Sequence, residues 1–479
     1  MTLAFRSPPP EPSPSGGEGS RGGLPSVPWP DVPEAAQDTV ATLVRVLREY
    51  RQAADVKAST RDEERLYDLV RDLIDQAVEQ PGRFGLHGVT AHRLANDAAF
   101  RHDVTRGTMA RASWLFPLSR LVYLMDGIEE IHVNRWDRWV LTTNRERMLL
   151  AADDNPFQSD ADVLTFFKEK VLSIPGFKGY RQLSEGHPAA EGNLGRVLRV
   201  CVVQEPAVSG STSVVATVRL QGAANLHSLA EYVQRGVMPN GVARFLEACV
   251  EGKANIIIAG GTATGKTTLL RVLCGLVAHT EQLLVIEDSA ELNLDGDRGD
   301  GREWHPLVQH LCTVPPSYGT ELGITMRDLA KLALRMRPNR IILGEARDAA
   351  MAEVCLVAST GHDGSMVTVH ADDAFQGVKR SAEYVMKSPD YAGNSNAYEL
   401  AEIAVHRAFN LVVHLVQDSD GMRRVSGILA LGGERTQTAW IYRRGPEGVL
   451  ERMTRHVGDL PLGLRRKLGQ HLGPEVPAV

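Results

Sequence analysis

The sequence predicts an α/β fold built around a parallel sheet, and two observations carry this prediction. After residue 254, short apolar runs typical of buried parallel strands alternate with helical patterns; the runs cover residues 256–259, 283–286, 341–343 and 366–369. The first run leads directly into a glycine-rich loop, and a helical pattern begins at the end of that loop. A strand, a glycine loop and a helix in this order are the setting that a phosphate-binding loop requires.

The glycine-rich loop and the start of its helix consist of Gly260, Gly261, Thr262, Ala263, Thr264, Gly265, Lys266, Thr267 and Thr268. Gly260 and Gly265 allow the backbone to curl so that successive N–H groups point at one anion. The helix N-terminus and Lys266 add positive charge, and the Thr267 hydroxyl offers a ligand to Mg²⁺. The alternative is a glycine-rich turn beside a surface lysine. The flanking strand and helix favour binding of a nucleoside triphosphate.

Composition narrows the class of protein. The chain has 479 residues, which leaves room for roughly two or three domains, and its net charge of -6 gives no support to bulk nucleic-acid binding. Its five cysteines are odd in number and widely spaced, which favours free thiols in a reducing compartment over disulfides or a metal site. No apolar run reaches the length of a membrane span. We therefore expect a cytoplasmic protein whose membrane contacts, if any, are made through partners.

Local patterns divide the chain into segments. We expect a disordered Pro/Gly-rich tail over residues 1–33, a helical segment over 34–112, an α+β domain over 113–220, a linker over 221–228, the nucleotide-binding domain over 229–432 and a C-terminal tail over 433–479. A capping box beginning at Thr60 starts the second helix, and Asp420 and Gly421 turn a hairpin near the end of the nucleotide-binding domain. Residues 183–212 carry scattered Gly and Pro and show no clear pattern.

Polar side chains follow three of the predicted strands, where a parallel sheet forms its ligand crevice. Glu287 can hold Mg²⁺ through water or polarise an attacking water. Glu345 follows an apolar strand, as in a Walker B element, and is long enough to act on the water nucleophile. His370 can touch the terminal phosphate or relay to a neighbouring subunit. The alternatives are solvated strand ends for the two acids and a structural role for the histidine.

Together these motifs resemble one family, the hexameric ATPases of bacterial type II and type IV secretion systems. The nearest branch is similar to the CpaF-type ATPases of tight-adherence (Flp) pili. The resemblance is carried by Ile286-Glu287-Asp288-x-x-Glu291-Leu292, by Leu334-Arg335-Met336-Arg337-Pro338-Asn339-Arg340 leading into Gly344-Glu345-Ala346-Arg347, and by Thr360-Gly361-His362-Asp363-Gly364-Ser365 with His370-Ala371. It covers about residues 115–431.

The resemblance implies a RecA-like P-loop ATPase domain behind an N-terminal α+β domain of PAS-like type, preceded here by an extra helical segment. It implies ATP and Mg²⁺ as ligands, a ring of six copies, and an inner-membrane platform protein as partner. Arg219 matches the family arginine that contacts the phosphates, Arg196 is a looser match, and arginines of the 335–340 cluster are available to a neighbouring copy. The chain departs from the family where Ala263 and Thr264 replace the branch's usual Gly-Ser.

Three functions follow as hypotheses. The first is an ATP-hydrolysing motor that assembles a pilus or drives secretion. The second is a nucleic-acid-transfer motor on the same scaffold, because a fold does not fix its cargo; the acidic net charge makes nucleic acid an unlikely partner. The third is a regulatory nucleotide-binding scaffold with little hydrolysis, suggested by Ala263 and Thr264.

Overall fold

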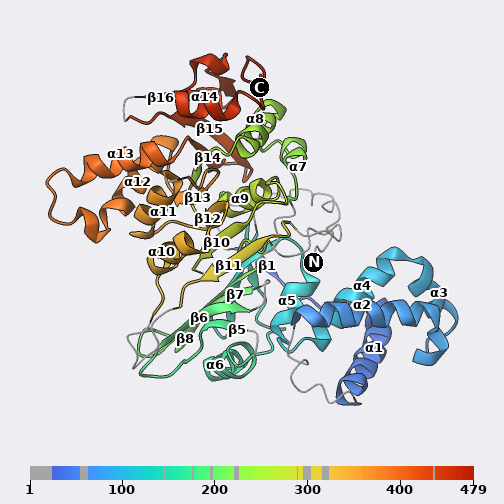
Figure 1. Ribbon diagram of the computed structural model, residues 1–479. Helices are drawn as coiled ribbons and strands as arrows, with labels where there is room; N and C mark the ends of the chain where they lie inside the picture. The colour runs from blue at the N-terminus through green and yellow to red at the C-terminus, as the bar shows by residue number, and fades with distance from the viewer. Residues whose placement is uncertain are drawn as a thin grey trace, which may run out of the picture. The chain divides into compact units, whose positions relative to one another are not determined.

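The computed structural model describes residues 24–53, 63–143, 146–174, 177–194, 198–220, 226–288, 290–294, 304–314, 323–359, 361–434 and 437–479. These residues form two compact units, one ending at residue 220 and one beginning at residue 226 (Figure 1). Four sequence-based predictions fall outside the described residues: the tail over 1–23, Thr60 of the capping box, Arg196, and the linker over 221–225.

The N-terminal unit is an α+β structure with one sheet in the order β1-β4-β3-β2-β8-β7-β6-β5. Its strands are β1 (Ser26–Val27), β2 (Ile128–Arg135), β3 (Arg138–Thr143), β4 (Arg147–Leu150), β5 (Phe177–Tyr180), β6 (Ala189–Leu194), β7 (Leu198–Gln204) and β8 (Val214–Leu220). Its helices are α1 (Glu34–Ala53), α2 (Glu63–Glu79), α3 (Gly88–Asn96), α4 (Ala98–Ala112), α5 (Leu118–Leu124) and α6 (Asp160–Phe166). β1 pairs in parallel with β4, and the other pairings are antiparallel.

One hydrophobic core joins the helices and the sheet of the N-terminal unit, with no break near residue 112. The core includes Trp29 and Val32, which are 3% and 2% exposed. The Trp29 ring lies 5.2 Å from that of Trp139 in an edge-to-face arrangement. Residues 24–33 are therefore held against the core by Trp29 and Val32, and the prediction of a disordered tail reaching residue 33 is wrong for them. Trp29 supplies the buried apolar area that the Pro-rich composition alone does not suggest.

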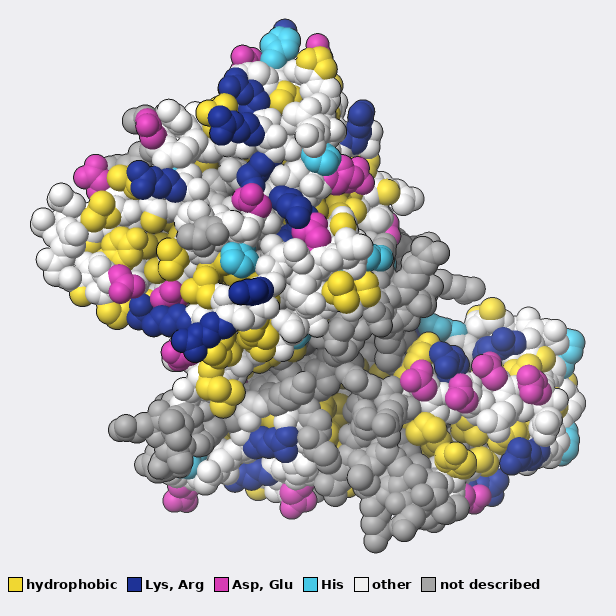
Figure 2. Space-filling view, viewed as in Figure 1, with side chains coloured by type: hydrophobic (Ala, Val, Ile, Leu, Met, Phe, Trp, Pro, Cys, Tyr) yellow, Lys and Arg dark blue, Asp and Glu magenta, His cyan; other side chains and the backbone are white. Residues whose placement is uncertain are grey.

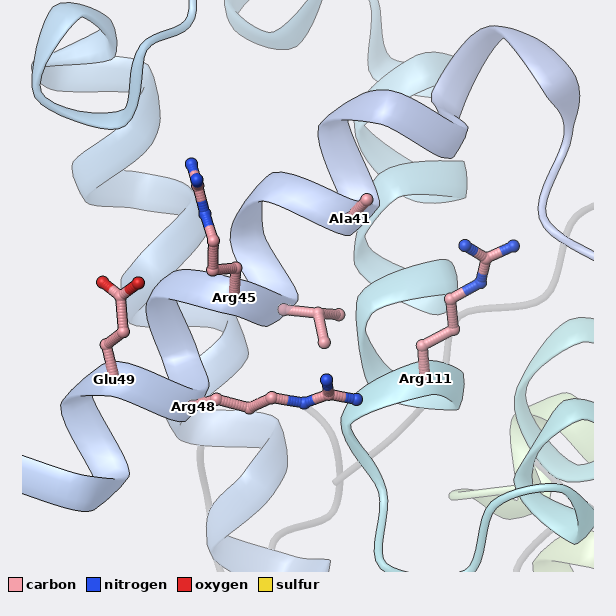
Figure 3. A pocket seen from close by; sticks show the side chains of 6 residues that line it. Ala41, Arg45, Arg48, Glu49 and Arg111 are labelled. Atoms are coloured by element: carbon pink, nitrogen blue, oxygen red, sulfur yellow. The ribbon is translucent and has the colours of Figure 1, made fainter.

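A shallow depression of about 330 Å³ lies between α1 and α4 of this unit (Figure 3). Arg45, Arg48 and Arg111 surround its apolar floor, which includes Val44. Arg111 is paired with Asp31 at 3.0 Å. The depression is thus a basic feature of the helical segment, separate from the residues that the sequence assigns to nucleotide chemistry.

The C-terminal unit contains a mixed sheet in the order β11-β10-β12-β13-β9-β14-β15-β16-β17. Its strands are β9 (Ile256–Gly260), β10 (Leu283–Glu287), β11 (Val308–Cys312), β12 (Arg340–Leu343), β13 (Met366–His370), β14 (Leu411–Gln417), β15 (Arg423–Leu431), β16 (Thr438–Arg444) and β17 (Leu450–Arg452). The strands from β11 to β14 are parallel, as the alternation of strands and helices predicts. β14 and β15 form the predicted antiparallel hairpin.

Helices cover both faces of this sheet, and each face has its own hydrophobic core. α7 (Leu229–Gln234), α8 (Asn240–Glu251), α9 (Lys266–Cys274) and α14 (Leu462–Leu468) pack on one face, and α10 (Met326–Met336), α11 (Ala350–Ser359), α12 (Ala374–Met386) and α13 (Ala397–Ala408) pack on the other (Figure 1). Alternate residues of β9 enter opposite cores: Ile256 and Ile258 face one, Ile257 and Ala259 the other. Burial on both faces explains the continuous apolar run of this strand.

The sheet continues beyond residue 432, where the sequence predicts a less regular tail with a basic helix around residues 464–472, close to the observed α14. β16 and β17 extend the antiparallel part of the sheet. The Tyr442 hydroxyl donates to the Pro477 carbonyl at 2.8 Å, and the Ala478 carbonyl lies directly over Gly241 of α8. The last residues therefore belong to the packed C-terminal unit. The short strands carry polar residues at the sheet edge, which hides their alternation in the sequence.

None of the helices in the described ranges is long and apolar enough to cross a membrane. Hydrophobic side chains do reach the surface over the α12–α13 pair (Figure 2). Phe375 and Leu400 are each 44% exposed there.

Candidate functional site

The glycine-rich loop between β9 and α9 has the backbone shape that its glycines predict. Gly265 is left-handed, with φ of +92°, and forms the N-cap of α9. A Cβ at Gly260 would lie 2.6 Å from the Leu415 carbonyl oxygen and 2.6 Å from the Thr264 hydroxyl, so only glycine fits. The loop thus turns tightly against β14 and starts the helix with its first N–H groups free of intrahelical partners. An anion is favoured at such a position.

Ala263 lies in the same loop with a positive φ of 59°. An L-residue with a Cβ is disfavoured in this region by about 1–2 kcal/mol. The neighbouring Thr264 hydroxyl donates to the Gly261 carbonyl at 3.0 Å and braces the turn. The sequence identifies Ala263 as a departure from the family pattern. The positive φ means that this alanine is strained at a position where glycine would not be.

Lys266 lies under the loop and is 7% exposed. Its ammonium group donates to the carbonyl oxygens of Gly260 at 3.0 Å and Gly261 at 2.6 Å. It also lies 3.3 Å from Nδ1 of His370. An ammonium group has only donors, so the Nδ1 atom of His370 is the acceptor in this contact.

Sheet register brings His370 to the loop. β13 lies beside β9, and His370 is the register partner of Gly260. Because Nδ1 accepts from Lys266, the other ring nitrogen, Nε2, carries the proton and donates to Glu345 Oε1 at 2.8 Å. Glu345 follows β12, the next strand in the sheet. Lys266, His370 and Glu345 therefore form one unbroken chain of contacts across three strand ends.

The pKa values of Glu345 and His370 both lie below the ordinary values of these groups. Burial alone would raise the pKa of Glu345, but Arg347, His370 and Lys266 outweigh it and hold the pKa below the ordinary range. Burial, followed by the positive charge of Lys266, lowers the pKa of His370. At neutral pH the carboxylate is therefore ionised and the imidazole is neutral.

Glu287 has a different setting from Glu345. It is 3% exposed, and its carboxylate accepts hydrogen bonds from the backbone N–H groups of Glu291 and Leu292. His310 of β11 lies 2.6 Å from the same carboxylate. Burial opposes a charge on His310, but Cys312 and Glu287 outweigh it and raise its pKa to about 9. These contacts make Glu287 an anchor for the loop after β10, and its assignment to catalysis and metal binding stays a prediction.

Sequence reasoning missed three side chains that organise the site. His310 fixes Glu287, Arg271 of α9 donates to the carbonyls of Glu291 and Leu292, and Arg347 contacts Glu345. Arg347 was within reach of sequence reasoning, because it directly follows the acidic strand end in a motif of the family. No pattern in the sequence marks the other two.

The predicted arginines are placed differently from one another. Arg219 ends β8 in the N-terminal unit, is half-exposed, and lies 3.8 Å from Glu130 of the neighbouring strand. In the 335–340 cluster, Arg335 and Arg337 are exposed. Arg340 is 1% exposed and forms a two-pronged ion pair with Glu281. The expectation that arginines of this cluster are available to a neighbouring copy is therefore wrong for Arg340, because its guanidinium group is used inside the C-terminal unit, and it stays a prediction for Arg335 and Arg337.

A depression of about 280 Å³ lies beside the loop. It is lined by Gly261 and Thr262, by His370, and by Gln376 and Arg380 of α12. His370, the middle member of the contact chain from Lys266 to Glu345, thus borders an open space beside the glycine-rich loop. A reacting phosphate and a water molecule need such a space.

The residues present fit a nucleotide with a bound Mg²⁺. The left-handed Gly265 at the N-cap and the start of α9 suit phosphate oxygens. Thr267 and Thr268 lie in the first turn of α9, and both are half-buried. The described residues contain no group of three or more His, Cys, Asp or Glu side chains that could hold a metal ion by itself. Mg²⁺ bound with a nucleotide takes several of its ligands from water and substrate phosphates, and the Thr267 hydroxyl is the protein ligand that the loop motif offers.

The strand order β10-β12-β13-β9-β14, with the glycine loop after the central strand β9, defines a RecA-like P-loop fold. Residues 193–430 match the family described as Type II/IV secretion system protein, so the chain contains a domain of this family.

Three comparisons illustrate the likeness. Conjugal transfer protein TrbB of Rhizobium radiobacter is 28% identical over 233 residues, which cover 48% of this chain and 63% of TrbB. Protein VirB11 of Agrobacterium fabrum is 38% identical over 146 residues, which cover 30% of this chain and 39% of VirB11. The crystal structure of the VirB11 ATPase from the Brucella suis type IV secretion system is 24% identical, with a TM-score of 0.33, and the match covers 66% of this chain and 95% of that chain.

Proposed function

We propose that this chain hydrolyses ATP and acts as a motor for pilus assembly or for type II/type IV secretion. One observation carries the proposal: Lys266 of the phosphate-binding loop is linked through His370 to the carboxylate of Glu345. A cation for the phosphates and an ionised acid for the water nucleophile are the two groups that phosphoryl transfer needs from the protein.

The roles follow from this arrangement. Lys266 exchanges its contacts with the Gly260 and Gly261 carbonyls for phosphate oxygens, while the loop N–H groups hold the anion. Glu345 orients the attacking water and accepts its proton. The water oxygen then bonds to the γ-phosphorus as the bond to the bridging oxygen breaks, which yields ADP and inorganic phosphate. Mg²⁺, held by the Thr267 hydroxyl and the phosphates, would supply charge neutralisation at these oxygens.

The assembly that suits this function is a ring of six copies at the cytoplasmic side of the inner membrane, docked on a platform protein. The domain of this family supports it. Arg219 is the candidate for completing the site on closure, and its exposed position on β8 leaves the guanidinium group accessible. The motifs quoted above favour the CpaF-type branch within the family.

A second candidate is a motor for conjugation-type nucleic-acid transfer. Relatives named conjugal transfer proteins favour it. The net charge of -6 opposes it, because nucleic-acid binding draws on a basic excess.

Phosphate release by the purified chain tests these functions. We expect ATP-dependent release in the wild type and none in Lys266→Ala, because that variant lacks the phosphate cation. Single-stranded DNA is expected to leave the rate unchanged. A several-fold stimulation that is lost at higher salt would favour the conjugation-type motor. Equal and negligible release by both proteins, with ATP still bound by the wild type, would favour a regulatory scaffold.

A further inference from the structure

Arg347 connects two acidic strand ends of the C-terminal sheet. One guanidinium nitrogen donates to Glu345 Oε2 at 2.6 Å, and another lies 3.6 Å from Asp288, which follows β10. His370 donates to the other oxygen of the same Glu345 carboxylate. Both oxygens of Glu345 therefore have a separate, directed donor, which fixes the plane of the carboxylate.

The backbone that carries Arg347 is itself fixed. The Ala346 N–H donates to the Thr368 carbonyl at 2.9 Å, and the Thr368 hydroxyl donates back to the Gly344 carbonyl. Lys387 donates to the Arg347 carbonyl from the end of α12. Ala346 is fully buried, so the side chains on either side of it, Glu345 and Arg347, extend from an anchored segment.

Charged groups from several elements face Glu345. Lys266 of α9 and Arg347 are cationic, His370 of β13 is neutral, and Tyr384 of α12 lies near enough to interact with the carboxylate. Within the described ranges, only Arg347 is both cationic and directly hydrogen-bonded to Glu345. The hydrogen bond that Arg347 donates to Glu345, together with the negative charge of Glu345, in turn raises the pKa of Arg347, which keeps the pair ionised.

Resting on the ATP hydrolysis proposed above, we propose that Arg347 is a positioning residue that holds Glu345 ionised and in one orientation for the attacking water. Arg347 acts through Glu345 and is not required for nucleotide binding. Its role is distinct from that of an arginine that neutralises phosphate charge, because its guanidinium group lies between two carboxylates.

Removal of Arg347 has two separable consequences. The carboxylate loses one of its two donors and gains rotational freedom, which lowers kcat by about 10- to 100-fold, since small misplacements at a reacting group are costly. The carboxylate also loses its strongest cationic neighbour, so its pKa rises. Because Glu345 must be ionised to accept a proton, activity on the acid side is then lost at higher pH than in the wild type.

The test compares Arg347→Gln with the wild type by measuring kcat and KM for ATP between about pH 3 and pH 8, a range that includes the acid limb set by the lowered pKa of Glu345. We expect a lower kcat, a KM within about twofold, and an acid limb moved to higher pH. Arg347→Lys restores a cation but not the planar fork, so it is expected to return the acid limb towards the wild-type position while recovering kcat only in part.

Arg327→Gln is the matched control, because Arg327 also bridges two acids, Glu353 at 3.0 Å and Asp390 at 3.1 Å, away from the loop. Its kcat and pH profile are expected to match the wild type. Wild-type hydrolysis with an unchanged pH profile in Arg347→Gln would overturn the positioning role alone. Absence of hydrolysis in the wild type would instead overturn the proposed function. A large rise in KM would mean that Arg347 binds nucleotide.

Discussion

At the scale of single residues, Ala263 is the clearest case of local strain in the site. Its φ of 59° lies where glycine is favoured, in a loop whose other left-handed residue is Gly265. The sequence alone marks Ala263 as unusual, but the backbone angle that makes it costly requires the folded loop. For Lys266, in contrast, the sequence motif alone predicts the role in phosphate binding. The structure adds only the contact of Lys266 with His370.

We expect Ala263→Gly to raise the free energy of unfolding slightly, by less than about 1 kcal/mol. Relief of the left-handed strain of about 1–2 kcal/mol is offset in part by the greater freedom of glycine in the unfolded chain. Thr262→Gly is the control; Thr262 has no positive φ, so this change should destabilise. Denaturant unfolding followed by two probes measures both. A loss of more than about 1 kcal/mol in Ala263→Gly would show that the methyl group is needed.

At the scale of elements, the start of β12 depends on a buried ion pair. Arg340 donates to both carboxylate oxygens of Glu281, at 3.1 and 2.8 Å, and to the Val250 carbonyl at 2.8 Å. Burial alone would raise the pKa of Glu281, but Arg340 and Lys253 outweigh it and lower the pKa. The pair therefore orients β12, the strand that leads to Glu345.

Arg340→Ala is expected to destabilise the C-terminal unit by about 3–5 kcal/mol, because it leaves Glu281 poorly compensated. Since the folded-state pKa of Glu281 is lowered, its contribution in the wild type is present above its unfolded pKa and is lost as the pH falls through the folded value. The difference between variant and wild type should shrink in acid. Thermal unfolding over a pH series measures this, with Arg335→Ala as the exposed control. A difference independent of pH would contradict the charge pairing.

The sequence predicts some of these elements well and others poorly. The parallel strands after β9 are buried on both faces, and their apolar runs and polar ends could be located from the sequence. β11 could not, because it is short and only partly buried, shows no continuous apolar run, and carries His310 outside any motif. The contact between His370 and Glu345 depends on the order of β12, β13 and β9, which a linear sequence does not display.

At the scale of the whole molecule, the function of the C-terminal unit can be predicted from the sequence better than that of the N-terminal unit. The glycine-rich loop and the strand order identify the fold of the C-terminal unit. The N-terminal unit carries no chemical motif, and the role of Arg219 there rests on the family resemblance. Trp29 and the packed C-terminal residues show that composition alone misjudges segments in which one or two side chains decide the packing.

If six copies complete one another's sites, hydrolysis per subunit should fall steeply when the protein is diluted below its assembly constant. Arg219→Ala should lower turnover with only a modest loss of ATP affinity, as expected for a contact formed mainly on closure. Arg138→Ala, an exposed arginine on β3, is the control. Full per-subunit turnover by a dilute monomer, and by Arg219→Ala, would rule out the ring mechanism.

The central claim is that Lys266, His370 and Glu345 form one hydrolytic site, and Glu345→Gln tests it most directly. The measurement is steady-state phosphate release together with ATP affinity, on the same preparation. Glutamine keeps the shape of the side chain and removes the proton acceptor, so ATP affinity should stay close to the wild type while turnover falls by about 10²- to 10⁴-fold. Turnover near the wild-type rate in Glu345→Gln would contradict the assignment.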